Sequence, residues 1–170
     1  MRRLVSTVVA VMVTVAACGG DDDPTLSDSA ATARLTPAGF TGAMTIDGAD
    51  FDASMVTGRD TVAWFWTPWC VICRGEAPDV AEAAERYADE VTFVGVAGLG
   101  PLADMQAFVE ETSTGSFTHL ADVDGAIWEE YGVLTQPAFA FIDEHGDVRA
   151  VTGGLSGGAL TDRVDDLIAA

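Results

Sequence analysis

Two cysteines separated by two residues, Cys70 and Cys73, stand at the junction between two kinds of sequence pattern. The preceding residues 61–66 are apolar and β-prone, which predicts a strand that is buried on both faces. The following residues 71–89 carry apolar side chains at helical spacing, which predicts a helix. Cys70 is therefore expected directly after a strand, and Cys73 in the first turn of the next helix.

This placement gives the two cysteines a defined chemistry. The free N–H groups and partial positive charge of a helix N-terminus stabilise a thiolate, and thiolate is the form that attacks a disulfide. Cys70, nearer the N-terminus, is expected to be exposed and nucleophilic. Cys73, one turn further along, is expected to be shielded and to resolve the mixed disulfide. The pattern thus predicts a redox-active disulfide between the two residues.

Three other interpretations of the cysteine pair stay open. A structural disulfide that closes so small a ring constrains the unfolded chain little, by about 2 kcal/mol. A zinc site needs four ligands, but only His119 and His145 remain, far apart and without zinc-finger spacing. Two plain buried cysteines are the third interpretation. We interpret both histidines as loop residues without a role, and we expect neither a metal nor a cofactor.

The N-terminus has the features of an export signal. Arg2 and Arg3 precede an apolar run, residues 4–17, which is typical of a secretion signal. This run is too short to cross a membrane as a stable helix, which needs about 20 residues. It ends in small residues directly before Cys18, a pattern that resembles a bacterial lipobox. We expect residues 1–17 to be a signal peptide and Cys18 to be lipidated; an ordinary signal with a chance cysteine is the alternative.

Lipidation of Cys18 would leave Cys70 and Cys73 as a pair without a competitor among the three cysteines. The protein is then expected to be extracytoplasmic, where disulfides persist, and lipid-anchored to the cell membrane. Residues 18–38 are rich in Asp, Ala, Ser and Thr, which indicates a flexible acidic tether. Residues 39–170 are expected to form one domain with its own core.

The chain is strongly acidic, with 27 Asp and Glu residues against 8 basic residues, all of them arginine. Binding to nucleic acid depends on cationic contacts with phosphates, so this function class is excluded. Docking on anionic lipid is disfavoured for the same reason, which leaves the acyl chain as the membrane attachment. The acidity indicates nothing further about the reaction.

The rest of the sequence alternates strand and helix patterns. Residues 44–51 alternate apolar and polar around a turn, which predicts a hairpin, and Pro78 is expected to kink the first helix. Further strands are expected at 91–97, 119–121, 138–143 and 147–151, and further helices at 101–111, 126–131 and 156–169. This order predicts a mixed sheet covered on both sides, without an internal repeat or a second domain.

Residues 65–74, FWTPWCVICR, resemble the signature of the thioredoxin fold. Over residues 40–170 the chain is similar to envelope-anchored thioredoxin-like proteins of the TlpA/ResA/DsbE-like group, including the sequence RGEAP that begins at Arg74. The resemblance implies an α/β thioredoxin fold, in which a central mixed sheet is flanked by helices, with an N-terminal β-hairpin and a central insertion at 98–131. It also implies a thiol–disulfide oxidoreductase that serves cytochrome c maturation or disulfide formation. Its partners would be exported protein thiols or disulfides, and a membrane electron-transfer protein.

A second part of the resemblance lies at residues 133–138, VLTQPA, where the family has a cis-proline that faces the cysteines. It implies that the bond between Gln136 and Pro137 is cis and that the Gln136 backbone binds the extended chain of a partner. An ordinary proline at the start of a strand is the alternative. Trp69, beside the nucleophile, is expected to form an apolar lip on this docking surface, and Trp66 is expected in the core.

One position departs from the minimal thioredoxin pattern. The buried aspartate six residues before the first cysteine is replaced here by Trp64, whereas Glu76 matches a glutamate of the envelope group. Residues i and i+3 share a helix face, so Glu76 is expected near the Cys73 sulfur. Partial burial there would raise its pKa and allow it to carry a proton. A surface glutamate favoured by the helix dipole is the alternative.

Two other function classes stay open. A thiol peroxidase shares the fold but needs a threonine and a proline at a set spacing, and Thr67 and Pro68 lie too close to Cys70 for that pattern. A non-catalytic binding lipoprotein would hold an inert disulfide, with a reduction potential below about −300 mV. Val71 and Ile72 are uncharged and do not indicate the direction of electron flow.

Overall fold

The computed structural model describes residues 37 and 39–170 of the 170-residue chain. The signal peptide, Cys18 and nearly all of the tether expected from the sequence lie outside these residues. The strands are β1 (Thr61–Trp66), β2 (Thr92–Gly98), β3 (Thr118–Asp122), β4 (Ala138–Ile142) and β5 (Val148–Thr152). The α-helices are α1 (Val71–Arg86), α2 (Leu102–Thr112), α3 (Ala126–Glu130) and α4 (Gly158–Ile168), and a short 3-10 helix spans Ala53–Met55.

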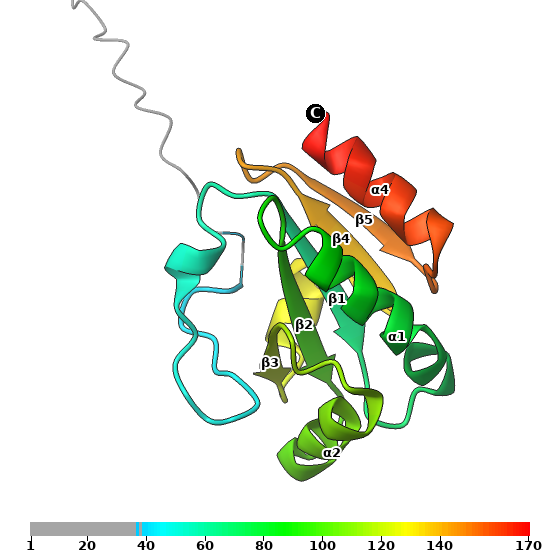
Figure 1. Ribbon diagram of the computed structural model, residues 1–170. Helices are drawn as coiled ribbons and strands as arrows, with labels where there is room; N and C mark the ends of the chain where they lie inside the picture. Colours follow the sequence, from blue (N-terminus) through cyan, green and yellow to red (C-terminus); the bar gives the residue numbers. More distant parts are fainter. Residues whose placement is uncertain (1–36, 38) are drawn as a thin grey trace, which may run out of the picture. The chain divides into compact units, whose positions relative to one another are not determined.

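The five strands form one mixed sheet in the order β3-β2-β1-β4-β5 (Figure 1). β1 and β2 are parallel, as are β2 and β3, whereas β4 runs antiparallel to both β1 and β5. All six residues of the central strand β1 are buried. The mixed sheet predicted from the sequence is therefore confirmed, with the strand that precedes the cysteines at its centre.

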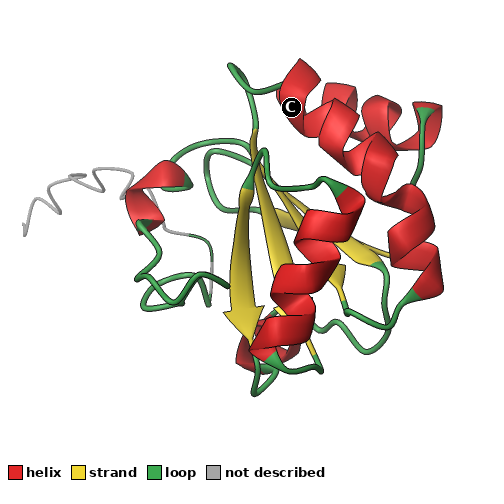
Figure 2. Cartoon of the chain, turned by 60° about the horizontal axis from the view of Figure 1, so that its bottom comes forward, coloured by secondary structure: helices red, strands yellow, loops and turns green. Residues whose placement is uncertain are grey.

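Alternate residues of β1 pack on opposite faces of the sheet. Trp64 and Trp66 lie in one core cluster together with buried residues of α1, α2 and α4. Phe65 lies in the other cluster, which is closed by α3 and by residues 40–56. Figure 1 shows α1 between α2 and α4 on the same side of the sheet, and Figure 2 shows the strands behind this helical layer. Burial on both faces accounts for the unbroken apolar run of β1.

The hairpin predicted near the N-terminus is reduced to a single antiparallel bridge between Met44 and Asp50. Two hydrogen bonds across the turn remain, from the Thr45 N–H to the Ala49 carbonyl at 2.8 Å and from the Phe51 N–H to the Ala43 carbonyl at 2.9 Å. The segment also bonds to β3, since the Ala121 N–H donates to the Met44 carbonyl at 2.8 Å and the Ile46 N–H to the His119 carbonyl at 2.9 Å. The segment thus covers the outer edge of β3, which would otherwise be open for pairing with another chain.

The remaining bounds agree with the predicted ones to within a few residues. α1 ends at Arg86 rather than Asp89, and its bounds include Pro78, so the proline does not end the helix. Among the described residues, no helix combines the length and the hydropathy needed to span a membrane.

His119 is a core residue, and its interpretation as a loop residue was wrong. It lies in β3 with 3% of its surface exposed, and its Nδ1 accepts a hydrogen bond from the Trp66 indole N–H at 3.2 Å. Burial lowers its pKa to about 4, so the ring is neutral and Nε2 donates to the Thr114 carbonyl. Gly95 on β2 leaves the space for the ring, because a Cβ there would overlap it. His145 lies exposed in the turn between β4 and β5.

Candidate active site

Cys70 occupies the N-cap position of α1, as the sequence predicts. β1 ends at Trp66, and a turn closed by the hydrogen bond from the Cys70 N–H to the Thr67 carbonyl, 3.1 Å, leads into the helix. The Cys70 sulfur accepts the Cys73 N–H at 3.0 Å. The sulfur therefore satisfies one of the free N–H groups of the first turn, where a capping oxygen usually lies. N–H groups at a helix N-terminus are the kind of donor that stabilises a thiolate.

Cys70 and Cys73 form a disulfide, with their Cα atoms 5.2 Å apart. Cys70 is 6% exposed and Cys73 is fully buried. Of the two cysteines, Cys70 is thus the one that solvent reaches. The prediction that Cys70 is an exposed residue is nevertheless wrong for the disulfide form. The reason is local, because its sulfur is bonded to a buried partner and turned toward the helix end.

An exposed apolar surface borders the disulfide. Trp69, which precedes Cys70, and Val71 and Ile72, which lie between the two cysteines, are all more than half exposed. The indole N–H of Trp69 donates to the Leu99 carbonyl at 3.1 Å, which ties this side chain to the loop after β2. Leu99 is itself exposed. Exposed apolar groups that gather around a reactive group are typical of a docking surface.

Pro137 lies next to the N-terminal turn of α1, as the resemblance implied, and the bond between Gln136 and Pro137 is cis. Gly154 lies close to both Pro137 and the first turn of α1, because a Cβ placed on it would lie 3.3 Å from the Ile72 side chain and 3.6 Å from that of Pro137. The Gly153 N–H donates to the Pro137 carbonyl at 2.9 Å. The proline loop and the residue between the cysteines therefore border the same surface.

Glu76 is buried, so the surface alternative was wrong. Only 4% of its surface is exposed, and Oε1 accepts the indole N–H of Trp64 at 2.7 Å. Oε2 accepts the backbone N–H of Leu155 at 3.1 Å. Burial raises the pKa of Glu76 to about 7, although both hydrogen bonds stabilise the carboxylate and oppose this shift. A group with this pKa can give or take a proton at neutral pH.

Two parts of this arrangement were not predicted from the sequence. Trp64, which was noted only as a departure, is a hydrogen-bond donor to the buried carboxylate. Residues 153–157, which we call the β5–α4 segment, hold α1 through backbone N–H groups: Leu155 donates to Glu76, and Gly157 to Asp79 at 2.9 Å. A residue's type does not determine where its backbone N–H points, so no signal in the sequence marks Leu155 or Gly157.

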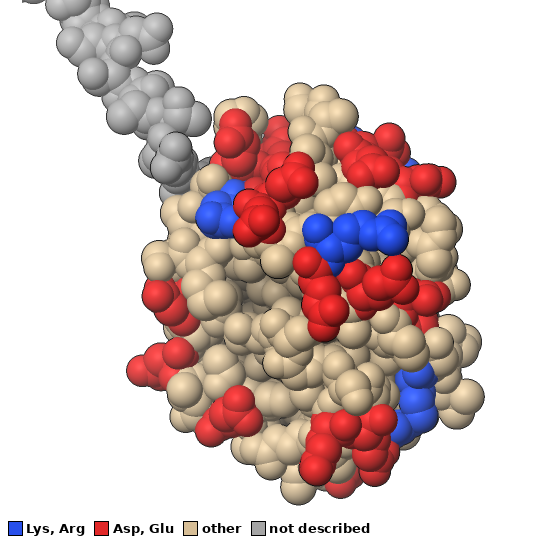
Figure 3. All heavy atoms as spheres, in the orientation of Figure 1, with Lys and Arg blue, Asp and Glu red and all other residues tan. Residues whose placement is uncertain are grey.

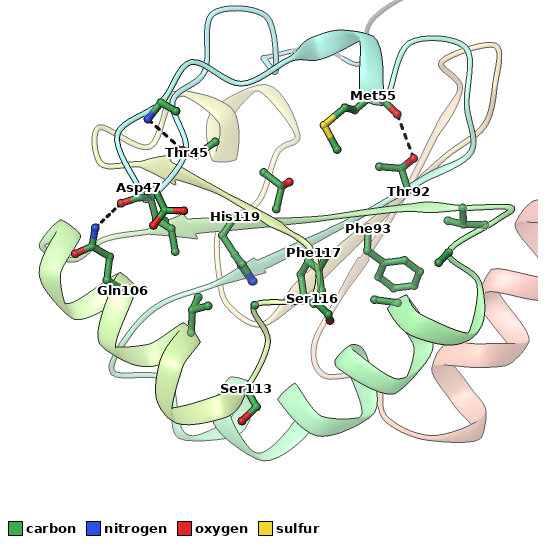
Figure 4. Close-up of a pocket in the computed structure, with 18 of the residues that line it drawn as sticks. Thr45, Asp47, Met55, Thr92, Phe93, Gln106, Ser113, Ser116, Phe117 and His119 are labelled. Carbon is green, nitrogen blue, oxygen red and sulfur yellow. Dashed lines mark hydrogen bonds between the residues drawn. The ribbon is translucent and has the colours of Figure 1, made fainter.

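A second hollow lies apart from the cysteines. It is a wide groove of about 1160 Å³. Figure 4 shows its lining residues, which come from the N-terminal segment, α2 and the starts of β2 and β3. Gln106 of α2 crosses to the Ile46 carbonyl at 2.7 Å, and Thr92 to the Met55 carbonyl at 3.1 Å. None of the cysteine-site residues lines this groove, so it is separate from the redox site.

Replacement of Glu76 by glutamine is expected to change how stability depends on pH. The folded-state pKa of about 7 is above the ordinary 4.5, so the folded chain binds this proton more tightly than the unfolded chain. The resulting stabilisation is present below pH 4.5 and is lost as pH rises through 7. Between pH 4.5 and 8 the unfolding free energy should therefore shift in favour of Glu76→Gln by about 1–3 kcal/mol.

Urea unfolding of both proteins in the disulfide form, at pH 4.5, 6 and 8, measures this shift. A difference in unfolding free energy that is the same at every pH comes from the hydrogen bond that the glutamine amide cannot accept. Only the change of this difference with pH is therefore informative. Glu85→Gln, at an exposed position of α1, is the matched control and should run parallel to the unaltered protein. Parallel curves for Glu76→Gln as well would show that Glu76 has no raised pKa.

The sequence and the structure were then compared with known proteins. The profile of the AhpC/TSA family matches residues 29–151. The soluble secreted antigen MPT53 of Mycobacterium tuberculosis is 42% identical over 125 residues, which cover 72% of this chain and 71% of the relative.

Two solved structures are similar over most of the chain. The structure of MTB DsbF, in its mixed oxidized and reduced forms, has 46% identity and a TM-score of 0.70, covering 80% of this chain and 96% of that one. A secreted Mycobacterium tuberculosis disulfide oxidoreductase, described as homologous to Escherichia coli DsbE, has 36% identity and a TM-score of 0.64, covering 81% of this chain and 96% of that one. The thioredoxin fold expected from the sequence is therefore shown.

Proposed function

The chain belongs to the AhpC/TSA family and is a thiol–disulfide oxidoreductase of thioredoxin fold, and from this premise we propose a membrane-anchored, extracytoplasmic enzyme that exchanges disulfides with exported proteins through Cys70 and Cys73. The observation that carries the proposal is the disulfide at the N-terminus of α1, directly after the central strand. A structural disulfide has no need of this position, whereas a nucleophilic thiolate gains stability from it.

The proposed reaction transfers two electrons between the enzyme and a partner. In the reducing direction, the Cys70 thiolate attacks a disulfide of the partner, and one partner sulfur leaves as a thiolate and takes up a proton. Cys73 then loses its proton and attacks the Cys70 sulfur, which breaks the mixed disulfide and releases the second partner sulfur. The enzyme ends as the Cys70–Cys73 disulfide and the partner as a dithiol; the same steps in reverse oxidise a partner.

Glu76 is the proposed proton carrier for Cys73. The two residues lie three positions apart on α1, on one helix face, and both are buried. Burial holds the pKa of Glu76 at about 7, which is where a general acid–base group works best at neutral pH. In the reducing direction the carboxylate accepts the Cys73 proton, and in the oxidising direction the carboxylic acid returns it.

The partner is proposed to bind as an extended segment across Trp69, Gln136 and Pro137. Trp69 offers an exposed apolar face, and the half-buried Gln136 lies at the edge of the proline loop. The Gln136 backbone is proposed to pair with the partner chain in the manner of an added strand.

The lipid on Cys18 is proposed to hold the domain at the outer side of the cell membrane after cleavage of residues 1–17. Residues 18–38 would then be a tether with a maximum reach on the order of 70 Å. Figure 3 shows acidic side chains spread over one face of the domain, with few arginines between them. Such a surface is repelled by anionic lipid, which favours attachment by the acyl chain over attachment through the domain.

Exchange with a cysteine-containing peptide tests the proposal in both directions. The oxidised protein is mixed with the reduced peptide, and the reduced protein with the peptide disulfide, and the products are separated by mass. Transfer in at least one direction supports the proposal. If neither mixture reacts, the disulfide is inert; if only hydrogen peroxide oxidises the reduced protein with turnover, the chain is a thiol peroxidase.

A further inference from the structure

Glu76 is held from two opposite sides by groups that cannot accept a proton. The indole N–H of Trp64, from β1, donates to Oε1 at 2.7 Å, and the backbone N–H of Leu155, from the β5–α4 segment, donates to Oε2 at 3.1 Å. Indole and backbone N–H groups are donors only. A proton on Glu76 therefore has no way out through either of its hydrogen-bond partners.

The two carboxylate oxygens are not equivalent. A hydrogen bond to an ionised group is stronger when it is shorter. The 2.7 Å bond from Trp64 to Oε1 is therefore stronger than the 3.1 Å bond from Leu155 to Oε2. Trp64 is fully buried. Each carboxylate oxygen is thus fixed by one N–H donor, and the donor on Oε1 is the stronger.

Gly154 keeps the space around Oε2 open. A Cβ on Gly154 would lie 2.7 Å from Oε2, closer than a carbon and an oxygen can approach, and 3.3 Å from the Ile72 side chain. The same Cβ would lie 3.6 Å from Pro137. Gly154 therefore lies directly against Oε2, and only a glycine permits this close approach, which lets the next residue, Leu155, bring its backbone N–H to Oε2.

The charged groups around Glu76 are few. Asp79, on the same helix, is the charged side chain that affects its pKa, and it raises it. β1 and the β5–α4 segment contribute Trp64 and backbone N–H groups, which carry no charge. Cys70 and Cys73 do not titrate in the disulfide form.

We infer that Trp64 and Gly154 are positioning residues that hold the Glu76 carboxylate with one N–H donor on each oxygen: the indole donates to Oε1, and the missing side chain at position 154 lets the Leu155 N–H reach Oε2. The inference rests on the proposed role of Glu76 as the proton carrier. In the reducing direction, the proton of the Cys73 thiol moves to the Glu76 carboxylate while the Cys73 sulfur forms its bond to Cys70. The electron pair of the broken mixed disulfide leaves with the partner sulfur.

Infrared difference spectra of the oxidised full-length protein test the inference, because the cysteines are silent in the disulfide form. The carboxylic-acid band of Glu76 is identified by its absence in Glu76→Gln and is followed from pH 5 to 9. Trp64→Phe removes the N–H donor and keeps an aromatic ring in the core. It should raise the midpoint of the band by about one pKa unit, since a hydrogen bond to a charged group is lost.

Gly154→Ala provides an independent variant that leaves the core aromatic intact. The added methyl group must displace Oε2 or the Leu155 N–H, which breaks the hydrogen bond between them. The midpoint of the Glu76 band should then also rise, by about one pKa unit. Gly158→Ala is the matched control, because a Cβ there meets no atom within 4 Å. Its midpoint should equal that of the unaltered protein.

Unchanged midpoints in folded Trp64→Phe and Gly154→Ala would overturn the inference, as would a Glu76 band that does not titrate between pH 5 and 9. A purely structural role is separated by the double variant Trp64→Phe/Glu76→Gln. The pH profile of exchange should shift for Trp64→Phe alone, and that shift should vanish once Glu76 is absent. If the unaltered protein exchanges no disulfides while its Glu76 band responds as expected, the proposed function fails and the positioning of the carboxylate stands.

Discussion

Cys70→Ser is expected to abolish disulfide exchange completely, whereas Cys73→Ser is expected to accumulate mixed disulfides with partner proteins. The serine at position 70 removes the sulfur that attacks the partner. The serine at position 73 leaves this attack intact but removes the thiol that resolves the mixed disulfide. Trapped complexes are measured by mass after rapid alkylation, and they should disappear on addition of a strong reductant.

Gly75→Ala is the control for nonspecific effects in the first turns of α1, because an added Cβ there meets no neighbouring atom within 4 Å. It should exchange disulfides at the rate of the unaltered protein. The assigned order of the two cysteines would be wrong if Cys73→Ser trapped nothing and its remaining Cys70 resisted alkylation at neutral pH. Trapping by Cys70→Ser instead would assign the attack to Cys73.

Cys18→Ala is expected to abolish incorporation of a labelled fatty acid and to release the protein from membranes. The lipid is proposed to be the membrane attachment, and a single substitution removes its acceptor sulfur. Cells that express either protein are labelled, lysed and separated into membrane and soluble fractions. The intact mass of each product then shows whether the signal peptide was removed.

The released Cys18→Ala protein should retain full exchange activity in solution, since residue 18 lies outside the proposed catalytic domain. Ser27→Ala, at a polar position of the proposed tether, is the matched control and should stay lipidated. A cleaved Cys18→Ala protein that remains in the membrane fraction would contradict the lipid anchor, as would an unaltered protein that takes up no fatty acid.

The placement of the cysteines was predictable because it depends on neighbouring residues. An apolar β-prone run followed by helical spacing determines a strand-to-helix junction, and Cys70 lies at the N-cap where these two patterns meet. The bounds of the strands and helices followed from the same short-range signals. The cis bond before Pro137 was implied by the resemblance alone, since the surrounding residues carry no signal for it.

The surroundings of Glu76 were not predictable to the same extent. Its main donor, Trp64, lies 12 residues earlier on a different element, and the sequence registered that position only as the absence of an aspartate. Its second donor is the backbone of Leu155, 79 residues away. His119 was misread for a similar reason, because its burial depends on the space left by Gly95 on the adjacent strand.

The reduction potential of the Cys70–Cys73 pair tests the central claim most directly. The purified protein is equilibrated with thiol–disulfide buffers of known potential, and the fractions of dithiol and disulfide are measured by mass after alkylation. A redox-active pair is predicted to have a potential between about −270 and −120 mV, the range covered by thiol–disulfide oxidoreductases. A potential below about −300 mV would mean an inert structural disulfide and would contradict the account.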